Sequence, residues 1–351
     1  MQLALQSIPA ILEITTDAAQ PEWDRYVASH PAATGYHVWG WRRVFEEAFG
    51  HETIYLSARE NSEIVGVLPL VVFRSALFGR FAVSLPFVNY GGVCARDGEV
   101  SEALIERARA IAVERRLAHV ELRHTARLLP ALPAREHKVG MYLALERDAA
   151  RAFELIDRKA RNQVRKAEKS GLTARSGGAE LLDAFYRVFA RNMRDLGTPV
   201  YSIRFFERVL STFPDRARVF LVDHGDVTVA GGITLSHRDT LEVPWASSLR
   251  EYRTQCPNNL LYWRIIEHAI AEGFRTLDFG RSTPNEGTFQ FKQQWGAAPR
   301  PLHWEYVLRG GGALPNLSPS NPRYRKAIDL WTRLPLPITN WLGPHIVRSI
   351  P

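Results

Sequence analysis

The sequence predicts an α/β protein, or an α+β protein, built from two tandem domains with the same order of elements and a C-terminal extension. Helix-like and strand-like segments alternate along nearly the whole chain. The order also repeats, because Val65-Gly66-Val67-Leu68 parallels Ala230-Gly231-Gly232-Ile233 at an offset of 165 residues (231 minus 66). In both halves a later helix then leads into a short strand with one acid, Glu121 or Asp278. Two copies at this spacing indicate tandem domains rather than a solenoid.

The elements of the first half follow from apolar periodicity and from turn residues. Strands are expected at 11–15, 53–58, 64–73, 81–88, 119–123 and 139–145, and helices at 21–30, 38–49, 99–116 and 149–170. The turn Glu60-Asn61-Ser62 joins two of these strands into a hairpin, and Gly171 stops the last helix.

The second half is expected to run in the same way. Helices are expected at 179–196, 203–213 and 258–272, and strands at 218–223, 227–236, 240–246, 275–279 and 302–308. The turn His224-Gly225-Asp226 makes a hairpin, and Pro257 and Gly273 bracket the last helix. The expected domains are 1–148, 149–310 with a basic helix at 151–170, and an extension at 311–351. The junction of the two domains is expected to form a cleft that binds ligands.

Composition narrows the class of protein and of partner. The chain has 351 residues, of which 46% are hydrophobic and 23% charged, as in ordinary globular proteins. Its net charge of +8 (45 basic minus 37 acidic) favours anionic partners, and a basic surface without such a partner is the alternative. Two cysteines in no metal or disulfide pattern, and no secretory or membrane-spanning segment, predict a cytoplasmic protein.

The stretch 277–296 is the strongest candidate site. A strand that carries Asp278 breaks at Gly280 into a polar loop that begins with Arg281 and Ser282. Strand ends that open into such loops are common ligand sites. Lys292 then lies among Phe289, Phe291 and Trp295, which can hold its stem and direct its charge. The alternative is a core aromatic cluster with a solvated lysine.

The basic helix is a second candidate. Arg158, Arg161 and Arg165 share one helical face, a spacing that suits bidentate binding of phosphates. The opposite face has only three small apolar residues, so we expect that core packing does not explain this helix. A solvated basic face is the alternative.

Two loops add further candidates. Asn89 and Tyr90 precede the glycine pair Gly91-Gly92, which allows a ligand to approach the backbone. Tyr201 follows a polar loop that begins at Gly197, and it could face a cleft. Structural turns are the alternative in both cases. The sequence contains no GxSxG, P-loop, HExxH or GxGxxG motif, and its scattered histidines predict no metal site.

These motifs together resemble the FemAB/FemX superfamily. They are the run from Asp278 to Ser282 with Gly287 to Gly296, the segment 161–171, Leu196-Gly197-Thr198-Pro199, the turn 86–92, and the tail with Leu334-Pro335-Leu336-Pro337 and Gly343-Pro344. The combination is most similar to the FemAB-like proteins associated with the XrtA/PEP-CTERM exopolysaccharide system. The resemblance implies two tandem GNAT-like domains, each with a mixed central sheet. It also implies transfer of an acyl or aminoacyl group to an amine of a cell-envelope or exopolysaccharide precursor, as in peptidoglycan synthesis.

The resemblance also implies roles for single residues. Lys292 would stabilise negative charge on the reacting oxygen. Asp278 would accept the proton of the amine, or would be only a structural acid at a strand end. Arg161 and Arg165 would bind the phosphate of a phosphorylated or lipid-linked saccharide acceptor. The other residues expected to bind substrate are Phe291, Arg281, Ser282, Trp295, Asn89, Tyr90 and Tyr201.

The acyl donor stays open between aminoacyl-tRNA and acyl-coenzyme A, and no tightly bound cofactor is expected. A coenzyme A-dependent GNAT acetyltransferase is the second hypothesis, although no glycine lies between Ala246 and Glu272 to cradle a pyrophosphate. A non-catalytic module that binds RNA or another anion is the third.

The tail adds an expectation about location. Between residues 323 and 351, tryptophans and aliphatic residues alternate with basic ones, which is typical of a membrane interface. Pro335, Pro337 and Pro344 exclude one long helix. A peripheral contact with the inner face of the cell membrane is therefore one expectation, and packing of the tail on the second domain is the alternative.

Overall fold

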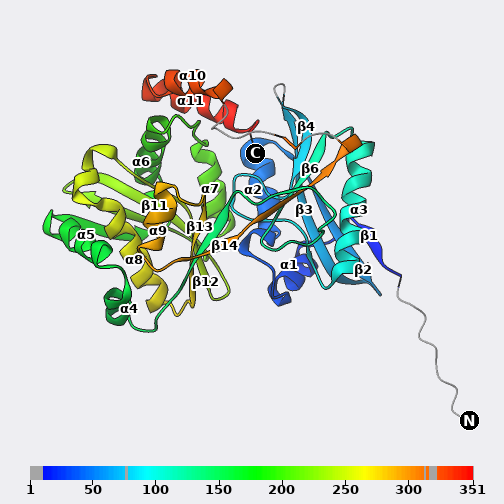
Figure 1. Cartoon of the computed structure of the whole chain (residues 1–351), viewed down its shortest axis with the longest axis horizontal. Coiled ribbons are helices and arrows are strands. Elements are labelled where there is room, and N and C mark those ends of the chain that lie inside the picture. Colours follow the sequence, from blue (N-terminus) through cyan, green and yellow to red (C-terminus); the bar gives the residue numbers. More distant parts are fainter. Residues whose placement is uncertain (1–10, 76–77, 312–313, 316–321, 351) are drawn as a thin grey trace, which may run out of the picture.

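Two lobes, each built around a mixed β-sheet, form the molecule (Figure 1). The structure is a computed structural model that describes residues 11–75, 78–311, 314–315 and 322–350. In each sheet one pair of strands is parallel and the others are antiparallel. The predicted α/β class is confirmed.

The first lobe contains an eight-stranded sheet with the order β1-β2-β3-β4-β6-β15-β7, and β5 pairs with β3 beside this path. Its strands are β1 (Glu13–Thr15), β2 (Glu52–Glu60), β3 (Glu63–Ser75), β4 (Gly79–Val83), β5 (Cys94–Ala95), β6 (His119–His124), β7 (Ala134–Arg135) and β15 (His303–Leu308). The helices of this part of the chain are α1 (Gln20–Ser29), α2 (Gly40–Phe49) and α3 (Gly98–Glu114). Asp97 caps α3, because its side chain accepts a hydrogen bond from Val100 N at 3.0 Å.

The second lobe contains a seven-stranded sheet with the order β14-β8-β13-β12-β11-β10-β9. Its strands are β8 (Val139–Ala144), β9 (Leu172–Gly177), β10 (Ala217–His224), β11 (Val227–His237), β12 (Thr240–Ser248), β13 (Thr276–Ser282) and β14 (Ala298–Pro301). Its helices are α4 (Ala149–Leu155), α5 (Arg158–Lys169), α6 (Leu182–Asp195), α7 (Ile203–Thr212), α8 (Pro257–Ala271) and α9 (Gly287–Gln293).

The internal repeat is visible in both sheets. The hairpin β2–β3 of the first lobe corresponds to the hairpin β10–β11 of the second lobe. The one parallel pair of each sheet also occupies the same place in the order, with β4 beside β6 and β12 beside β13. The acid-bearing strands that the sequence singled out, β6 with Glu121 and β13 with Asp278, are the second members of these two pairs.

Two strands lie in the sheet that the other half of the chain builds. β8 precedes residue 148, yet it pairs with β13 and β14 in the second lobe. β15 comes after all the other strands, yet it pairs with β6 and β7 in the first lobe, as the orange strand among the cyan ones in Figure 1 shows. The sheets therefore divide the chain differently from the segments 1–148 and 149–310.

Several expected elements need correction. The helix expected at 149–170 is two helices, because Asp157 leaves the helical conformation and caps α5 by accepting from Lys159 N at 2.7 Å. The strand expected at 81–88 ends at Val83, and a loop with left-handed backbone at Leu85 and Phe87 follows it. No strand was expected where β9 lies. The aromatic run around Lys292 forms α9.

The expectation that core packing does not explain the basic helix also needs correction. Ala160, Val164 and Ala167 of α5 are 0%, 1% and 0% exposed, and they belong to the apolar core of the second lobe. Small side chains let α5 pack closely on α8. Core packing therefore explains this helix, contrary to the expectation.

A continuous apolar core joins the two lobes. Phe45, Phe73 and Phe87 of the first lobe share one buried cluster with Phe206 and Trp245 of the second lobe. The helices α2 and α7 cross so closely that a Cβ on Gly40 would lie 2.8 Å from the Phe213 ring. Because this contact is apolar and well packed, we expect the lobes to move little relative to each other.

The tail forms two helices, α10 (Pro322–Trp331) and α11 (Leu336–Val347), as its prolines predicted. Pro335 is the N-cap of α11, and Gly343 of α11 packs against Val200. The expected packing of the tail on the second lobe is thus present. Within the described residues, no helix is long and apolar enough to span a membrane.

A buried carboxylate anchors β15 in the first lobe through hydrogen bonds. Glu305 is 0% exposed, and its Oε2 lies 2.7 Å from His124 Nδ1. The backbone N–H groups of Leu128 and Leu129 donate to the two carboxylate oxygens at 3.1 and 3.0 Å. These contacts hold the Glu305 pKa below its usual value, although burial opposes them.

We expect Glu305→Ala to lower the free energy of unfolding by about 3 kcal/mol, because it leaves the buried Nδ1 atom of His124 and two backbone donors without a partner. Urea denaturation followed by circular dichroism measures this change. Glu136→Ala is the matched control, since Glu136 pairs with His303 at 2.9 Å but is exposed, and it should change stability by less than about 0.5 kcal/mol. Equal effects of the two substitutions would contradict the anchoring role.

Candidate functional site

The candidate site lies where β12 and β13 separate. These parallel strands pair only from Thr240 to Glu242 and from Thr276 to Asp278, so the two acids form the last pair before the strands diverge. The register of β12 against β11 shifts between Ile233 and Leu235, next to Pro244, which has no N–H to donate. Paired residues of parallel strands point to the same face, so both carboxylates project together.

Both carboxylates are buried and held by residues of the first lobe. Glu242 is 8% exposed and Asp278 is 3% exposed. Tyr36 OH and Asn89 Nδ2 each donate to Glu242 Oε1 at 2.6 Å. Tyr90 OH donates to Asp278 Oδ1 at 3.0 Å, and the Gly280 N–H donates to the same oxygen at 2.7 Å. One lobe thus carries the acids, and the other orients them.

Burial makes both acids weak. It raises the pKa of Asp278 to about 7, against the hydrogen bonds from Gly280 and Tyr90. Burial, together with the nearby charge of Asp278, raises the pKa of Glu242 well above its usual value. Asp278 can therefore exchange a proton readily near neutral pH, and such acids are the typical choice for general acid–base chemistry.

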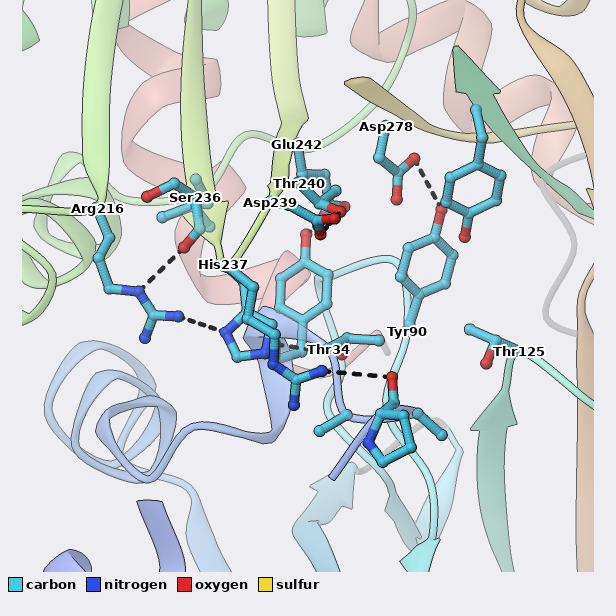
Figure 2. A pocket seen from close by; sticks show the side chains of 18 of the residues that line it. Thr34, Tyr90, Thr125, Arg216, Ser236, His237, Asp239, Thr240, Glu242 and Asp278 are labelled. Atoms are coloured by element: carbon cyan, nitrogen blue, oxygen red, sulfur yellow. Dashed lines mark hydrogen bonds between the residues drawn. The ribbon is translucent and has the colours of Figure 1, made fainter. Parts of the chain in front are cut away.

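The pair faces a cavity of about 350 Å³ between the lobes (Figure 2). Its wall is aromatic, and it is formed by Tyr36, Trp41, Tyr90, Tyr142 and Phe213. Figure 2 shows Asp278 and Glu242 entering from the strands of the second lobe, with Tyr90 reaching Asp278 from below. Acids within an aromatic wall suit a ligand that carries an amine, because the carboxylates attract the ammonium group and the rings stabilise it.

Arginine side chains lie at another part of this cavity. Arg216 donates to Ser236 O at 3.0 Å and contacts His237 Nδ1 at 2.6 Å, as Figure 2 shows. Burial lowers the His237 pKa to about 4, so this imidazole is neutral at neutral pH. Arg238 donates to carbonyls at the end of α1, including Val27 O at 2.7 Å. The second of these arginines therefore also links the two lobes.

A second cavity of about 650 Å³ is lined by residues of β12, α5, α8 and α9. Its basic residues are Lys159, Arg250, Arg253 and Lys292, with Asp195 as the single acid. The first turn of α8 also lines it at Pro257 and Asn258, and no side chain caps this helix. Cations beside the N-terminal end of a helix suit a phosphorylated ligand.

Lys292 connects the two cavities. It lines the second one, it is 8% exposed, and its Nζ donates to Gly280 O at 3.3 Å and to Arg281 O at 2.9 Å. The N–H of the same Gly280 donates to Asp278, which lines the first cavity. Burial lowers the pKa of Lys292 to about 8, while the nearby charge of Asp278 opposes this shift. Gly280 has a φ of +72°, and a Cβ there would lie 2.7 Å from Asn89 Nδ2, so only glycine fits.

The other predicted site residues lie in three different surroundings. Phe291 lines the second cavity, whereas Trp295 is 1% exposed in the core of the second lobe. Tyr201 packs in the aromatic cluster between the lobes, with its ring 5.7 Å from that of Phe87. Ser282 is buried, and its hydroxyl has no partner among the described residues.

Three arginines that the sequence pointed to make no side-chain hydrogen bond or ion pair with the two carboxylates among the described residues. Arg281 lies over the Trp304 ring at 5.3 Å, and its Nη1 is buried without a partner in the described part of the chain. Arg161 and Arg165 of α5 line neither of the two cavities, and Arg165 lies over the Phe153 ring at 5.4 Å.

Sequence reasoning missed Glu242, Tyr36 and the arginines of the first cavity. Glu242 stands between Leu241 and Val243 in a strand that was correctly expected to be apolar, and an acid in such a strand was the available signal. Tyr36 had no local signal, because its partner lies 206 residues away. In the parts of the chain that the structure describes, no group of three or more His, Cys, Asp or Glu side chains could hold a metal ion.

Comparison with known proteins identifies the fold. Residues 157–293, in the second lobe, match a family model described as an acetyltransferase (GNAT) domain. A search of curated proteins returned no significant match to the chain. The crystal structure of FemX is similar, with a TM-score of 0.65 and 15% identity over 84% of this chain and 97% of that chain.

Two further solved structures are similar in the same way. A tandem GNAT protein from the clavulanic acid biosynthesis pathway, without AcCoA, has a TM-score of 0.56 and 14% identity over 87% of this chain and 100% of that chain. The C-terminal domain of a putative lysylphosphatidylglycerol synthetase from Agrobacterium fabrum has a TM-score of 0.56 and 12% identity over 83% of this chain and 91% of that chain. Identities this low establish the fold alone, which is the expected pair of GNAT-like domains.

Proposed function

We propose that the chain is an N-acyltransferase that moves an acyl or aminoacyl group from an anionic donor to an amine. The match of residues 157–293 to an acetyltransferase domain supports acyl transfer. The observation that carries the proposal is the buried pair Glu242 and Asp278, which faces an aromatic cavity at the point where two parallel strands separate. An amine must lose a proton as it attacks a carbonyl carbon, and a carboxylate with a raised pKa can accept it.

The amine of the acceptor would enter the first cavity and give its proton to Asp278, which Tyr90 and Gly280 hold in place. The amine nitrogen then forms a bond to the acyl carbon of the donor, and negative charge develops on the acyl oxygen. Lys292 lines the second cavity and contacts the Gly280 that holds Asp278, and its ammonium group stabilises this charge. Collapse of the intermediate breaks the bond to the leaving group, and the acid of the pair returns a proton.

The donor would lie in the second cavity. Its cations and the uncapped first turn of α8 suit a phosphorylated group, which both aminoacyl-tRNA and acyl-coenzyme A contain. The FemX and lysylphosphatidylglycerol synthetase likenesses agree with an aminoacyl donor. The tandem GNAT protein and the acetyltransferase domain match agree with acyl-coenzyme A. Aminoacyl transfer is our first choice, because the sequence motifs resemble those of the FemAB/FemX superfamily.

The acceptor would be an amine of a cell-envelope or exopolysaccharide precursor, phosphorylated or lipid-linked. This choice, and the association with the XrtA/PEP-CTERM system, rest on the sequence motifs. An amino sugar fits the chemistry of the first cavity, because it offers an amine to the carboxylates and an apolar ring face to the tyrosines.

A two-donor assay tests the proposal. The purified chain is incubated with labelled aminoacyl-tRNA or labelled acetyl-coenzyme A, together with a nucleotide-linked amino sugar, and mass spectrometry follows the amine. We expect a mass gain of one acyl group in one of the two arms. Salt-dependent binding of tRNA without turnover of either donor would instead indicate a non-catalytic anion-binding module.

A further inference from the structure

The helix α11 has one buried face, and it also carries exposed apolar side chains. With 3.6 residues per turn, Thr339, Gly343 and Val347 lie along one face, and all three are buried. A Cβ on Gly343 would lie 2.8 Å from Val200 N, so this face packs tightly on the loop before α7. This face alone explains how α11 is held on the second lobe.

Other apolar side chains of α11 are exposed. Ile338, Trp341 and Ile346 are 42%, 68% and 37% exposed, and Leu330 at the end of α10 is 64% exposed. Other exposed large apolar side chains, such as Val113, Leu155 and Val227, lie singly on separate elements, which is normal for a surface. Four within residues 330–346 form a concentration that indicates an interaction surface.

The same segment is strongly basic. Residues 322–351 contain five basic residues and one acid, Asp329, which is a net charge of +4 (5 minus 1) within a chain of +8. Arg333 precedes α11 and Arg348 follows it, and both are exposed. Neither makes an ion pair with the residues that the structure describes. Exposed arginines thus stand before and after the exposed apolar residues of α11 in the sequence.

We propose that this surface, the α11 face (Leu330, Arg333, Ile338, Trp341, Ile346 and Arg348), docks on an anionic lipid membrane. An indole beside aliphatic side chains inserts at the boundary of headgroups and acyl chains, while arginines bind lipid phosphates. Figure 1 shows α10 and α11 together on the outer edge of the second lobe, where a flat surface can reach them. A symmetric contact with a second copy would bring +4 against +4, so the charge favours lipid over self-association.

The proposal is independent of the transfer reaction, because docking needs no substrate. It gives α11 two roles: the buried residues hold the helix on the protein, and the exposed residues contact lipid. Only the second is affected by substitutions at the exposed positions, so the fold and the transfer of a soluble acceptor should survive them.

Vesicle flotation with the full chain tests the proposal. The vesicles contain phosphatidylcholine alone or phosphatidylcholine with about one third phosphatidylglycerol. We expect the chain to float with the anionic vesicles, and to do so at least about tenfold less when Ile338→Ser and Trp341→Ser are combined. Arg333→Glu with Arg348→Glu should reduce flotation similarly, and added salt should weaken it. Val113→Ser on α3 is the matched control, since Val113 is 62% exposed on the other lobe, and it should float as the unchanged chain does.

Three results would overturn the proposal. In the first, the chain does not float with anionic vesicles. In the second, the Ile338/Trp341 variant floats as well as the unchanged chain does. In the third, the chain sediments as a dimer without lipid, and these substitutions convert it to a monomer. The last result would assign the α11 face to a second copy of the chain. Circular dichroism of each variant shows whether it is folded, and a misfolded serine variant is replaced by Trp341→Gln alone.

Discussion

Asp278→Asn is expected to lower kcat for acyl transfer by about 10³-fold, the usual contribution of a positioned general base. Asparagine keeps an oxygen that can accept from Tyr90 and Gly280, so the contacts at 3.0 and 2.7 Å can persist while the proton acceptor is lost. KM for the amine should change much less than kcat. Asp226→Asn, in the exposed turn between β10 and β11, is the matched control and should leave kcat unchanged.

The pH profile distinguishes a base from a structural acid. Because burial raises the pKa of Asp278 to about 7 in the ligand-free protein, the fraction of free carboxylate, and with it kcat/KM, should increase as the pH rises through 7. The asparagine variant should lose this acidic limb. Activity within about threefold of the unchanged chain, or a retained limb near pH 7, would remove Asp278 from the mechanism and leave it as a structural acid at a strand end.

Stability should change in the opposite direction from activity. The folded chain holds the Asp278 proton more tightly than the unfolded chain, in which the pKa is near 3.8. The contribution of Asp278 to stability is therefore complete below pH 4 and is lost as the pH rises toward 7. At pH 8 the asparagine variant should be at least as stable as the unchanged chain, and thermal unfolding at pH 5 and pH 8 measures this difference. Such a loss of stability is expected where function places a charge in a buried site.

Local sequence features predicted part of this site and could not predict the rest. Asp278, Gly280 and Lys292 lie within one short stretch, so strand periodicity, a glycine break and an aromatic cluster were enough to select them. Glu242 lies in an expected strand, but its role appears only when β12 is placed beside β13. The tyrosine that orients Glu242 comes from the other lobe, and no local pattern reports a contact across 206 residues.

The same limit applies to the fold. Apolar periodicity predicted most of the strands, and the internal repeat predicted two similar lobes. Both signals can be read directly from the order of residues in the sequence. The exchange of β8 and β15 between the sheets is decided by which edge strand is available in three dimensions. Buried contacts such as Glu305 with His124, 181 residues apart, then select the arrangement.

Lys292→Met is expected to lower kcat by about 10²- to 10³-fold, the cost of removing one group that stabilises a reacting oxygen. Methionine matches the length and apolar stem of lysine, so the 8% exposed site stays filled and the fold should survive. Lys166→Met on the exposed side of α5 is the matched control and should retain full activity. Full activity of the Lys292 variant would show that the acyl oxygen is stabilised elsewhere.

The basic limb of the pH profile reports on Lys292. Burial lowers its pKa to about 8 in the ligand-free protein, so the ammonium group, and with it kcat/KM, should be lost as the pH rises above 8. Together with Asp278, this predicts a narrow optimum between about pH 7 and 8. The methionine variant should lose only the basic limb, and the Asp278→Asn variant only the acidic one. An unchanged basic limb in the methionine variant would assign that titration to another group.

The double variant decides whether the two groups act on one step. If Asp278 accepts the proton of the amine while Lys292 stabilises the charge that the same attack creates, each is useful only when the other is present. The combined loss should then be close to the larger single loss, and not to the product of the two. A multiplicative loss would place the two groups in separate steps, with Asp278 in the attack and Lys292 in the departure of the leaving group. Single-turnover kinetics with preformed donor complex separates these steps.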